Sequence, residues 1–119
     1  PENALHKTAI LSRSINCGTG VMFGPRCVVN AKTEIGNGVI LNTGSIVEHE
    51  CNIGHYVHIG PGAVLCGNVR VGENSLIGAG SVVLPGTVIG KNVIIGAGTV
   101  VNKNVGDGIK LAGNPGKAI

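Results

Sequence analysis

An apolar residue stands at every sixth position from Leu5 to Val101, and this repeat restricts the fold more than any other feature of the chain. The seventeen hexads that it defines cover residues 5–106 without an insertion or a deletion. The fifth position of each hexad holds mostly small or β-branched residues, as an inward position crowded by neighbouring layers requires. A period of six matches neither an α-helix nor an array of hairpins, and it predicts short strands joined by tight corners.

Three such strands complete a triangular coil of eighteen residues, and each strand hydrogen-bonds to its equivalent one coil away. Residues i and i+18 are then expected to lie on top of one another. The composition supports a thin coil, because 2% aromatic residues and 21 glycines leave few bulky side chains for a wide core. The sequence therefore predicts an all-β parallel helix with a narrow aliphatic interior.

Charge and cysteine content exclude several classes of protein. The net charge is +3, but the nine Lys and Arg residues are scattered without aromatic neighbours, which argues against a nucleic-acid partner. No apolar run approaches the ~20 residues that a membrane span needs, so we expect no membrane segment in this chain. Four cysteines without a C-x-x-C pair indicate reduced thiols and a cytoplasmic protein: Cys17, Cys27, Cys51 and Cys66.

The repeat resembles that of the hexapeptide-repeat acetyltransferases, and the stretches 77–83 (IGAGSVV) and 95–101 (IGAGTVV) are typical of it. The resemblance implies a left-handed parallel β-helix of between five and six coils, followed by an irregular tail over 107–119. It also implies a homotrimer with active sites between subunits. We expect residues 1–119 to form a single acetyltransferase domain. A start at Pro1 without an initiator methionine suggests a domain excised from a longer protein.

The segment 48–58 (EHECNIGHYVH) holds the one dense cluster of titratable side chains. It resembles the E-H-E-C-x-I-G-x-x-x-H block of the branch that contains sialic acid O-acetyltransferases and bacillosamine-type sugar N-acetyltransferases. That resemblance implies that His49 is the general base, that Glu50 orients its ring, and that His58 lies in the acceptor pocket. An imidazole beside a carboxylate suits this role, because it titrates near neutrality and its cation is stabilised. His55 and Glu48 receive no catalytic role.

The eighteen-residue spacing places Gly67 one coil beyond His49, and Asn68 follows it. We expect both residues to line the substrate site. A glycine leaves the backbone accessible, so the Gly67 N–H is a candidate oxyanion donor, as the related enzymes are thought to use; the alternative is a glycine kept only for its turn. Both interpretations stay open at the level of sequence.

Acetyl-CoA is the implied co-substrate, and no metal is expected. Glycine-rich corners suit extended pantetheine, and lysines suit its phosphates. The ending 113–117 (GNPGK) is similar to the G-x-P-A-[KR] ending of the family, with glycine where alanine is usual, and in relatives this segment leaves the helix near the coenzyme. The cofactor candidates are Gly67, Gly78, Gly96, Lys103, Gly113, Pro115 and Lys117.

These features predict acetyl transfer from acetyl-CoA to the amine of a nucleotide-linked sugar of the UDP-4-amino-sugar type. The alternatives are O-acetylation of a sugar or sialic acid, a zinc enzyme like the carbonic anhydrases of this fold, and a non-catalytic trimeric solenoid. The zinc alternative is disfavoured because His49, His55 and His58 lack the H-x-x-x-x-H spacing of that group. In the resembling branch an N-terminal α/β domain holds the nucleotide, and this chain lacks it.

Overall fold

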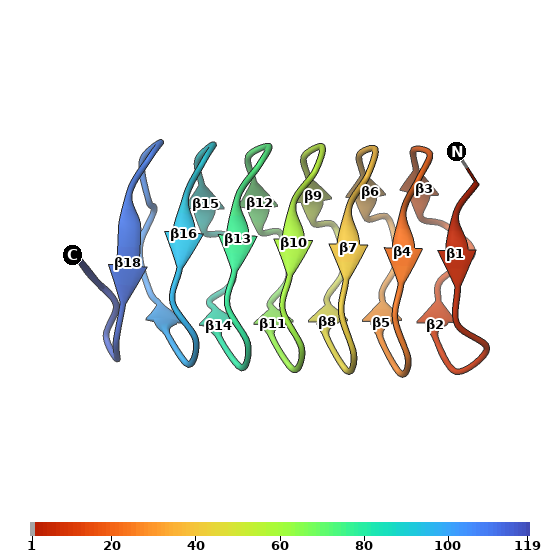
Figure 1. Ribbon diagram of the computed structural model, residues 1–119, viewed down its shortest axis with the longest axis horizontal. Coiled ribbons are helices and arrows are strands. Elements are labelled where there is room, and N and C mark those ends of the chain that lie inside the picture. The colour runs from red at the N-terminus through yellow and green to blue at the C-terminus, as the bar shows by residue number, and fades with distance from the viewer. Residues whose placement is uncertain (1) are drawn as a thin grey trace.

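The computed structural model describes residues 2–119, which form a triangular prism of short, mostly parallel strands (Figure 1). Its principal extents are 36 × 21 × 19 Å. Three sheets run along the prism, and we name them A, B and C in the order in which the chain first visits them. Each coil crosses the three sheets in turn, and the corners between them form three edges, AB, BC and CA.

Within residues 2–119 every strand except β18 is two residues long. Sheet A faces the viewer in Figure 1 and contains β1 (Ala4–Leu5), β4 (Met22–Phe23), β7 (Ile40–Leu41), β10 (His58–Ile59), β13 (Leu76–Ile77), β16 (Ile94–Ile95), β18 (Lys110–Ala112) and β19 (Lys117–Ala118). Sheet B contains β2 (Ile10–Leu11), β5 (Val28–Val29), β8 (Ile46–Val47), β11 (Val64–Leu65), β14 (Val82–Val83) and β17 (Val100–Val101). Sheet C contains β3 (Asn16–Cys17), β6 (Glu34–Ile35), β9 (Asn52–Ile53), β12 (Arg70–Val71) and β15 (Val88–Ile89).

The strands pair in parallel with partners eighteen residues apart in all three sheets. Ile40 pairs with His58 in sheet A, and Ile46 pairs with Val64 in sheet B. The predicted stacking of residues i and i+18 is confirmed, and so is the all-β parallel helix, which has about six coils. Every residue of one coil therefore has a defined neighbour one strand spacing, ~4.8 Å, away in the next coil.

The core is built from the first and fifth positions of the hexads, as predicted. Both positions point into the prism, where side chains from successive coils stack in columns. Only the first coil departs from this, since Leu5 is 60% exposed because no described coil precedes it. The largest fully buried side chains are Leu41, Ile53, Ile59, Leu65, Ile77, Ile89, Ile95, Val21, Val29, Val39, Val47 and Val57.

The corners turn through a left-handed residue at the fourth position of the hexad. Glycine suits this position because it lacks the Cβ that disfavours positive φ, and Gly38, Gly44 and Gly62 occupy it with φ of 65–67°. Other residue types adopt the same conformation at a cost in free energy. Among residues 2–119 these are Arg26, Lys32, Glu50, Tyr56, Asn68, Asn74 and Asn92.

The C-terminal end differs from the sequence prediction in two ways. Val105, which the hexad count assigns to a fifth position, bridges Ile89 across only sixteen residues, so the last corner is two residues shorter. The tail is also less irregular than expected, because β18 stacks on β16 and continues sheet A, and β19 folds back antiparallel to β18. Leu111 of β18 is buried, and it covers the end of the core.

Ser45 carries the one buried side-chain oxygen or nitrogen of residues 2–119 that makes no hydrogen bond. We expect Ser45→Ala to raise the free energy of unfolding by about 1 kcal/mol, because it removes a desolvated hydroxyl that has no partner. Ser81 is the matched control two coils away. Its Oγ donates to the Gly96 carbonyl (3.0 Å) and accepts from the Thr99 N–H (3.3 Å), so Ser81→Ala should lose about 1 kcal/mol. Urea unfolding of both variants tests the pair, and equal losses would contradict it.

Candidate active site

His49 lies at the tip of the BC edge, in the turn that joins β8 to β9. Its imidazole points along the edge toward the next coil rather than into the core. The Nδ1 atom lies 3.2 Å from Oε1 of Glu50, and both side chains are 60% exposed. A carboxylate accepts here, so in the neutral imidazole this contact favours the tautomer with the proton on Nδ1 and the free lone pair on Nε2. This tautomer is the one that a general base needs.

Gly67 occupies the position one coil beyond His49, as the eighteen-residue spacing predicts. A Cβ atom built on Gly67 would lie 2.7 Å from His49 Nε2 and 2.8 Å from Cε1. The imidazole therefore fills the space that any other residue's side chain would occupy. Gly67 thus leaves room for the observed position of the His49 ring, which is a reason for a glycine beyond the conformational demands of a turn.

The backbone around Gly67 offers a hydrogen-bond donor beside Nε2. The Asn68 N–H is already used, because it donates to the His49 carbonyl at 2.9 Å. The Gly67 carbonyl accepts from the Gly86 N–H at 3.0 Å. By contrast, the Gly67 N–H donates to no acceptor of residues 2–119. Of the two residues predicted from the sequence, Gly67 is thus the one with an open amide.

Glu50 adopts the left-handed conformation (φ 60°) that glycine or asparagine takes elsewhere in the prism. We expect Glu50→Asn to raise the free energy of unfolding by about 0.5–1 kcal/mol, because asparagine tolerates positive φ better than glutamate. The same change should lower kcat at least ~10-fold, because the His49 ring loses the carboxylate that orients it and stabilises its cation. Thermal unfolding and steady-state kinetics of one preparation test both effects, and unchanged kcat would remove Glu50 from the site.

Glu48 and Cys51, the other two residues of the turn 48–51, make hydrogen bonds within the prism. Glu48 Oε1 accepts a hydrogen bond from Asn30 Nδ2 at 3.1 Å, one coil earlier on the same edge. Cys51 is buried beneath the corner, and its Sγ donates to the Cys66 carbonyl at 3.2 Å. Burial raises the pKa of the Cys51 thiol, and the nearby Glu48 charge adds a smaller increase. The thiol therefore stays protonated and is a poor nucleophile.

His58 lies on the outer surface of sheet A, with its Nε2 3.4 Å from Asn42 Nδ2. In a triangular prism the BC edge is opposite sheet A, so one chain does not bring His58 to His49. Asn42 was missed by the sequence analysis, although its distance of sixteen residues from His58 in a coil of eighteen could have indicated the contact.

The two other histidines, His55 of segment 48–58 and His6 near the N-terminus, each contact a polar group of a nearby residue. His55 lies on the CA edge, where its Nδ1 accepts from the Asn37 N–H at 2.8 Å. His6 contacts Thr8, with 2.8 Å between Nδ1 and Oγ1. His49, His55 and His58 thus occupy the BC edge, the CA edge and sheet A. Within residues 2–119 no three His, Cys, Asp or Glu side chains converge as a metal site would require.

The cofactor candidates fall on different parts of the prism. Lys103 lies on the BC edge, three coils beyond His49, whereas Gly78 and Gly96 lie on the AB edge. The N–H groups of Ala79 and Ala97, next to those glycines, donate to no acceptor of residues 2–119.

The C-terminal candidates Gly113, Pro115 and Lys117 form the turn and second strand of the β18–β19 hairpin. Gly116 is buried there, and a Cβ on it would lie 2.7 Å from Leu111 Cδ2. This contact explains the glycine where the family ending has alanine.

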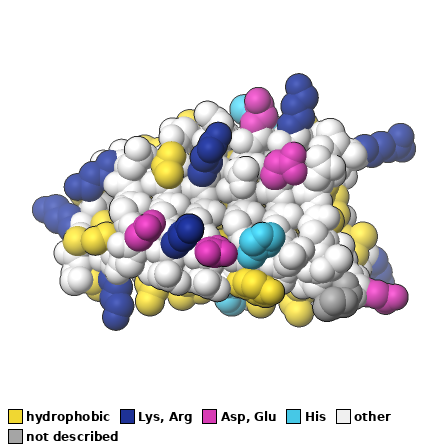
Figure 2. Space-filling view, turned by 90° about the horizontal axis from the view of Figure 1, so that it is seen from above, with side chains coloured by type: hydrophobic (Ala, Val, Ile, Leu, Met, Phe, Trp, Pro, Cys, Tyr) yellow, Lys and Arg dark blue, Asp and Glu magenta, His cyan; other side chains and the backbone are white. Residues whose placement is uncertain are grey.

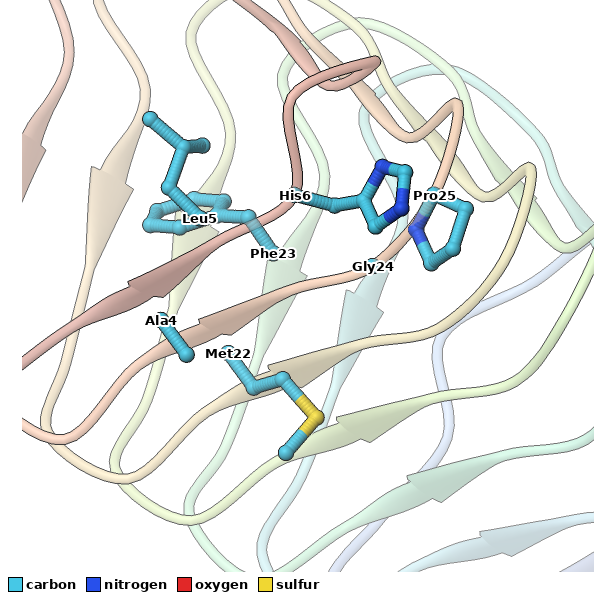
Figure 3. Close-up of a pocket in the computed structure, with 7 residues that line it drawn as sticks. All are labelled: Ala4, Leu5, His6, Met22, Phe23, Gly24 and Pro25. Atoms are coloured by element: carbon cyan, nitrogen blue, oxygen red, sulfur yellow. The ribbon is translucent and has the colours of Figure 1, made fainter.

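A separate hollow lies at the N-terminal end of the prism (Figure 3). It is lined by apolar and backbone groups of the first two coils, with His6 at its rim. The sticks in Figure 3 include no acid–base pair. The hollow lies on sheet A and the AB edge, one to two coils before the coil of His49, so within one chain it does not adjoin the BC edge.

On the face that Figure 2 shows, basic and acidic side chains are interspersed along the middle of the prism, and several basic side chains lie at its left end. Residues 2–119 include no helix with the length and apolar character to cross a membrane. The absence of a nucleic-acid partner stays a prediction.

The family profile described as bacterial transferase hexapeptide (six repeats) matches residues 32–67, 50–84 and 68–103. These overlapping matches cover 32–103, more than half of the 119 residues. The chain belongs to the bacterial transferase hexapeptide family. The predicted resemblance to hexapeptide-repeat transferases is confirmed.

Several solved hexapeptide transferases superimpose closely on this chain. PerB from Caulobacter crescentus, in complex with CoA and GDP-perosamine, is 40% identical with a TM-score of 0.98, over 99% of this chain and 57% of that one. The acetyltransferase domain of PglB from Neisseria gonorrhoeae, in complex with acetyl coenzyme A, is 40% identical with a TM-score of 0.96, over 98% and 57%. WeeI from Acinetobacter baumannii is 31% identical with a TM-score of 0.94, over 97% and 57%.

The chain spans less than two thirds of the length of these structures. A search of curated proteins found no match. The solved relatives therefore supply the comparison for function.

Proposed function

We propose that this protein is an acetyl-CoA-dependent N-acetyltransferase that acts on a nucleotide-linked amino sugar, with residues 1–119 as its acetyltransferase domain. The observation that carries the proposal is the imidazole of His49, which is oriented by Glu50 and lies over Gly67 with Nε2 open. The complexes of PerB with CoA and GDP-perosamine, and of the PglB domain with acetyl coenzyme A, support the two substrate classes.

In the proposed reaction, the amine of the acceptor attacks the thioester carbonyl of acetyl-CoA. His49 Nε2 accepts the proton that the amine loses as the C–N bond forms, and Glu50 stabilises the resulting imidazolium. The open Gly67 N–H donates to the oxyanion of the tetrahedral intermediate. When the C–S bond breaks, the departing thiolate takes a proton from the imidazolium, and His49 returns to its starting state.

We propose that the site forms between subunits of a homotrimer. His49, Glu50 and Gly67 lie on the BC edge, whereas His58 lies on sheet A. This separation supports a site in which the BC edge of one subunit meets sheet A of the next, a heterologous contact that closes with threefold symmetry. Sedimentation should give a trimer at micromolar concentration, and a monomer alone would count against the interfacial site.

The coenzyme is proposed to run from His49 toward the C-terminal coils. Lys103 is three coil spacings, ~14 Å, from His49, which suits the distance from a thioester to the phosphates of an extended coenzyme. The open amides beside Gly78 and Gly96, from the AB edge of the neighbouring subunit, would bind the pantetheine arm. The hairpin with Gly113, Pro115 and Lys117 would cover its end.

A cytoplasmic location is part of the proposal. All four cysteines are free thiols, which fits a reducing compartment: Cys17, Cys27, Cys51 and Cys66. Acetyl-CoA and nucleotide-linked sugars, the proposed substrates, are both made in the cytoplasm.

The test is mass spectrometry of acetyl transfer from acetyl-CoA to a panel of UDP- and GDP-linked amino sugars, with the matching hydroxyl sugars beside them. We expect a gain of one acetyl group on an amino sugar and none on its hydroxyl counterpart. Transfer to the hydroxyl sugars instead would replace the proposal by O-acetylation. No transfer to either class by correctly assembled protein would contradict acetyltransferase activity on sugars.

A further inference from the structure

Two basic residues, Arg13 and Lys32, continue the BC edge on the N-terminal side of His49. The register places Arg13, Ala31 and His49 in one column, two residues after Leu11, Val29 and Val47 respectively. In the adjacent column Lys32 lies one coil before Glu50. Arg13 is thus two coils and Lys32 about one coil from the catalytic corner, and both are exposed.

Neither cation has an ionic partner within the described part of the chain. The ion pairs found in residues 2–119 are His49–Glu50 and Lys91–Glu73, so Arg13 and Lys32 are in none. The guanidinium group of Arg13 and the ammonium group of Lys32 are therefore available to a ligand.

The carboxylates near this stretch of the edge are already engaged. Glu34 accepts from Asn16 Nδ2 at 3.2 Å, Glu48 accepts from Asn30 Nδ2, and Glu50 accepts from His49. None of these three carboxylates forms an ion pair with Arg13 or Lys32 within residues 2–119.

The backbone adds a third donor. On the CA edge, side chains cap some of the N–H groups at the third hexad position, as His55 caps Asn37 N–H and Asp107 Oδ1 caps Lys91 N–H (2.8 Å each). On the BC edge, Ala31 occupies the same position, but its N–H donates to no acceptor of residues 2–119. An open N–H between a lysine and an arginine is a suitable site for phosphate oxygens.

Lys32 also holds the left-handed conformation, with φ 59°, where glycine or asparagine would be less strained. Its N–H is tied to Ser14 Oγ at 2.9 Å, which fixes the backbone of this corner. The exposed lysine side chain starts from this corner, one coil from Glu50.

We propose that Arg13, Lys32 and the Ala31 N–H bind the diphosphate of the nucleotide-linked acceptor. This inference rests on the proposed function and deepens it. A pyranose that presents its amine to His49 holds its glycosyl phosphate on the opposite side of the ring, about one to two coil spacings of ~4.8 Å away. Lys32 and Arg13 lie at these distances. The BC edge is then divided at His49, with the acceptor diphosphate on the N-terminal side and acetyl-CoA on the C-terminal side.

The test compares Lys32→Asn, Lys32→Arg and Arg13→Gln with the wild-type protein in its full-length form. Asparagine is chosen at position 32 because it tolerates the positive φ. We expect Lys32→Asn and Arg13→Gln each to raise KM for the nucleotide sugar about tenfold, the loss expected for one charge-assisted contact. KM for acetyl-CoA and kcat should stay within about twofold, and Lys32→Arg should restore most of the affinity.

Calorimetric titration with GDP and UDP separates this proposal from the proposed function, because binding needs no acetyl transfer. Weaker binding in Lys32→Asn and Arg13→Gln, without a change in Lys91→Ala on the CA edge, would support the diphosphate site even if no transfer occurred. Active variants with unchanged nucleotide affinity would overturn it, as would wild-type protein that binds neither nucleotide at millimolar concentration. A rise in KM for acetyl-CoA alone would also overturn it. A fall in kcat alone would overturn it too, because it would mean that Lys32 acts on Glu50 and not on the nucleotide sugar.

Discussion

His49→Ala is expected to lower kcat/KM for acetyl transfer at least ~100-fold, the usual contribution of a general base. Without the imidazole, the amine must lose its proton to solvent as it attacks. KM for both substrates should change little, because the ring contacts the reacting nitrogen rather than the bulk of either substrate. Unfolding should also be nearly unchanged, because the side chain is 60% exposed and lies outside the core.

The control for this variant is His6→Ala, which removes an exposed histidine from the first coil. Mass spectrometry of the acetylated sugar gives rates for both variants under the same conditions. If His49→Ala and His6→Ala acetylate the sugar at nearly equal rates, His49 has no part in the mechanism. Comparable unfolding temperatures are needed to attribute the loss to chemistry.

Gly67→Ala is expected to lower kcat by about 10–100-fold through the position of His49 rather than its removal. The new Cβ would lie 2.7 Å from Nε2, closer than real Cβ contacts allow. Because the imidazole is exposed, it can swing out of the way at little cost in stability. The ring then loses its alignment with the Gly67 N–H, and the base and the oxyanion donor no longer face the same carbonyl.

Gly106→Ala is the matched control, because a Cβ on Gly106 meets nothing within 4 Å and its φ is not in the left-handed region. It should retain full kcat and a similar unfolding temperature. Kinetics and circular dichroism of the two variants are the measurements. A fully active Gly67→Ala protein would show that His49 does not act from the position described here.

Much of the scaffold could be predicted because the hexad repeat determines two separate properties of the fold. It sets the two inward columns, and it sets the eighteen-residue neighbours of every residue. Gly67 beneath the His49 ring follows from that second property alone. The prediction was wrong where the period changes, at Val105, because a corner shortened by two residues leaves no signal in a count of sixes.

The placing of His49 and His58 on different parts of the prism and the unused N–H donors were less accessible from the sequence. The resemblance to the E-H-E-C-x-I-G-x-x-x-H block grouped His58 with His49. Nine residues are half a coil, which leads from the BC edge to the opposite sheet, so this grouping stays a prediction that needs a second subunit. Nor does a list of lysines distinguish Lys32 from the rest. Its significance depends on its place one coil from Glu50 and outside the ion pairs of residues 2–119.

The sequence by itself determined the parallel β-helix, its inward columns and the Glu-His-Glu corner, because each depends on a strict period and on local residue types. Only the tertiary structure decided which N–H groups are open, which cations are unpaired and which residues share an edge. The physical reason is that hydrogen bonds and ion pairs form or fail to form with small changes in the distance between donor and acceptor atoms on neighbouring coils. A repeat in the sequence fixes which residues are neighbours, but it leaves open which of their polar groups are already satisfied.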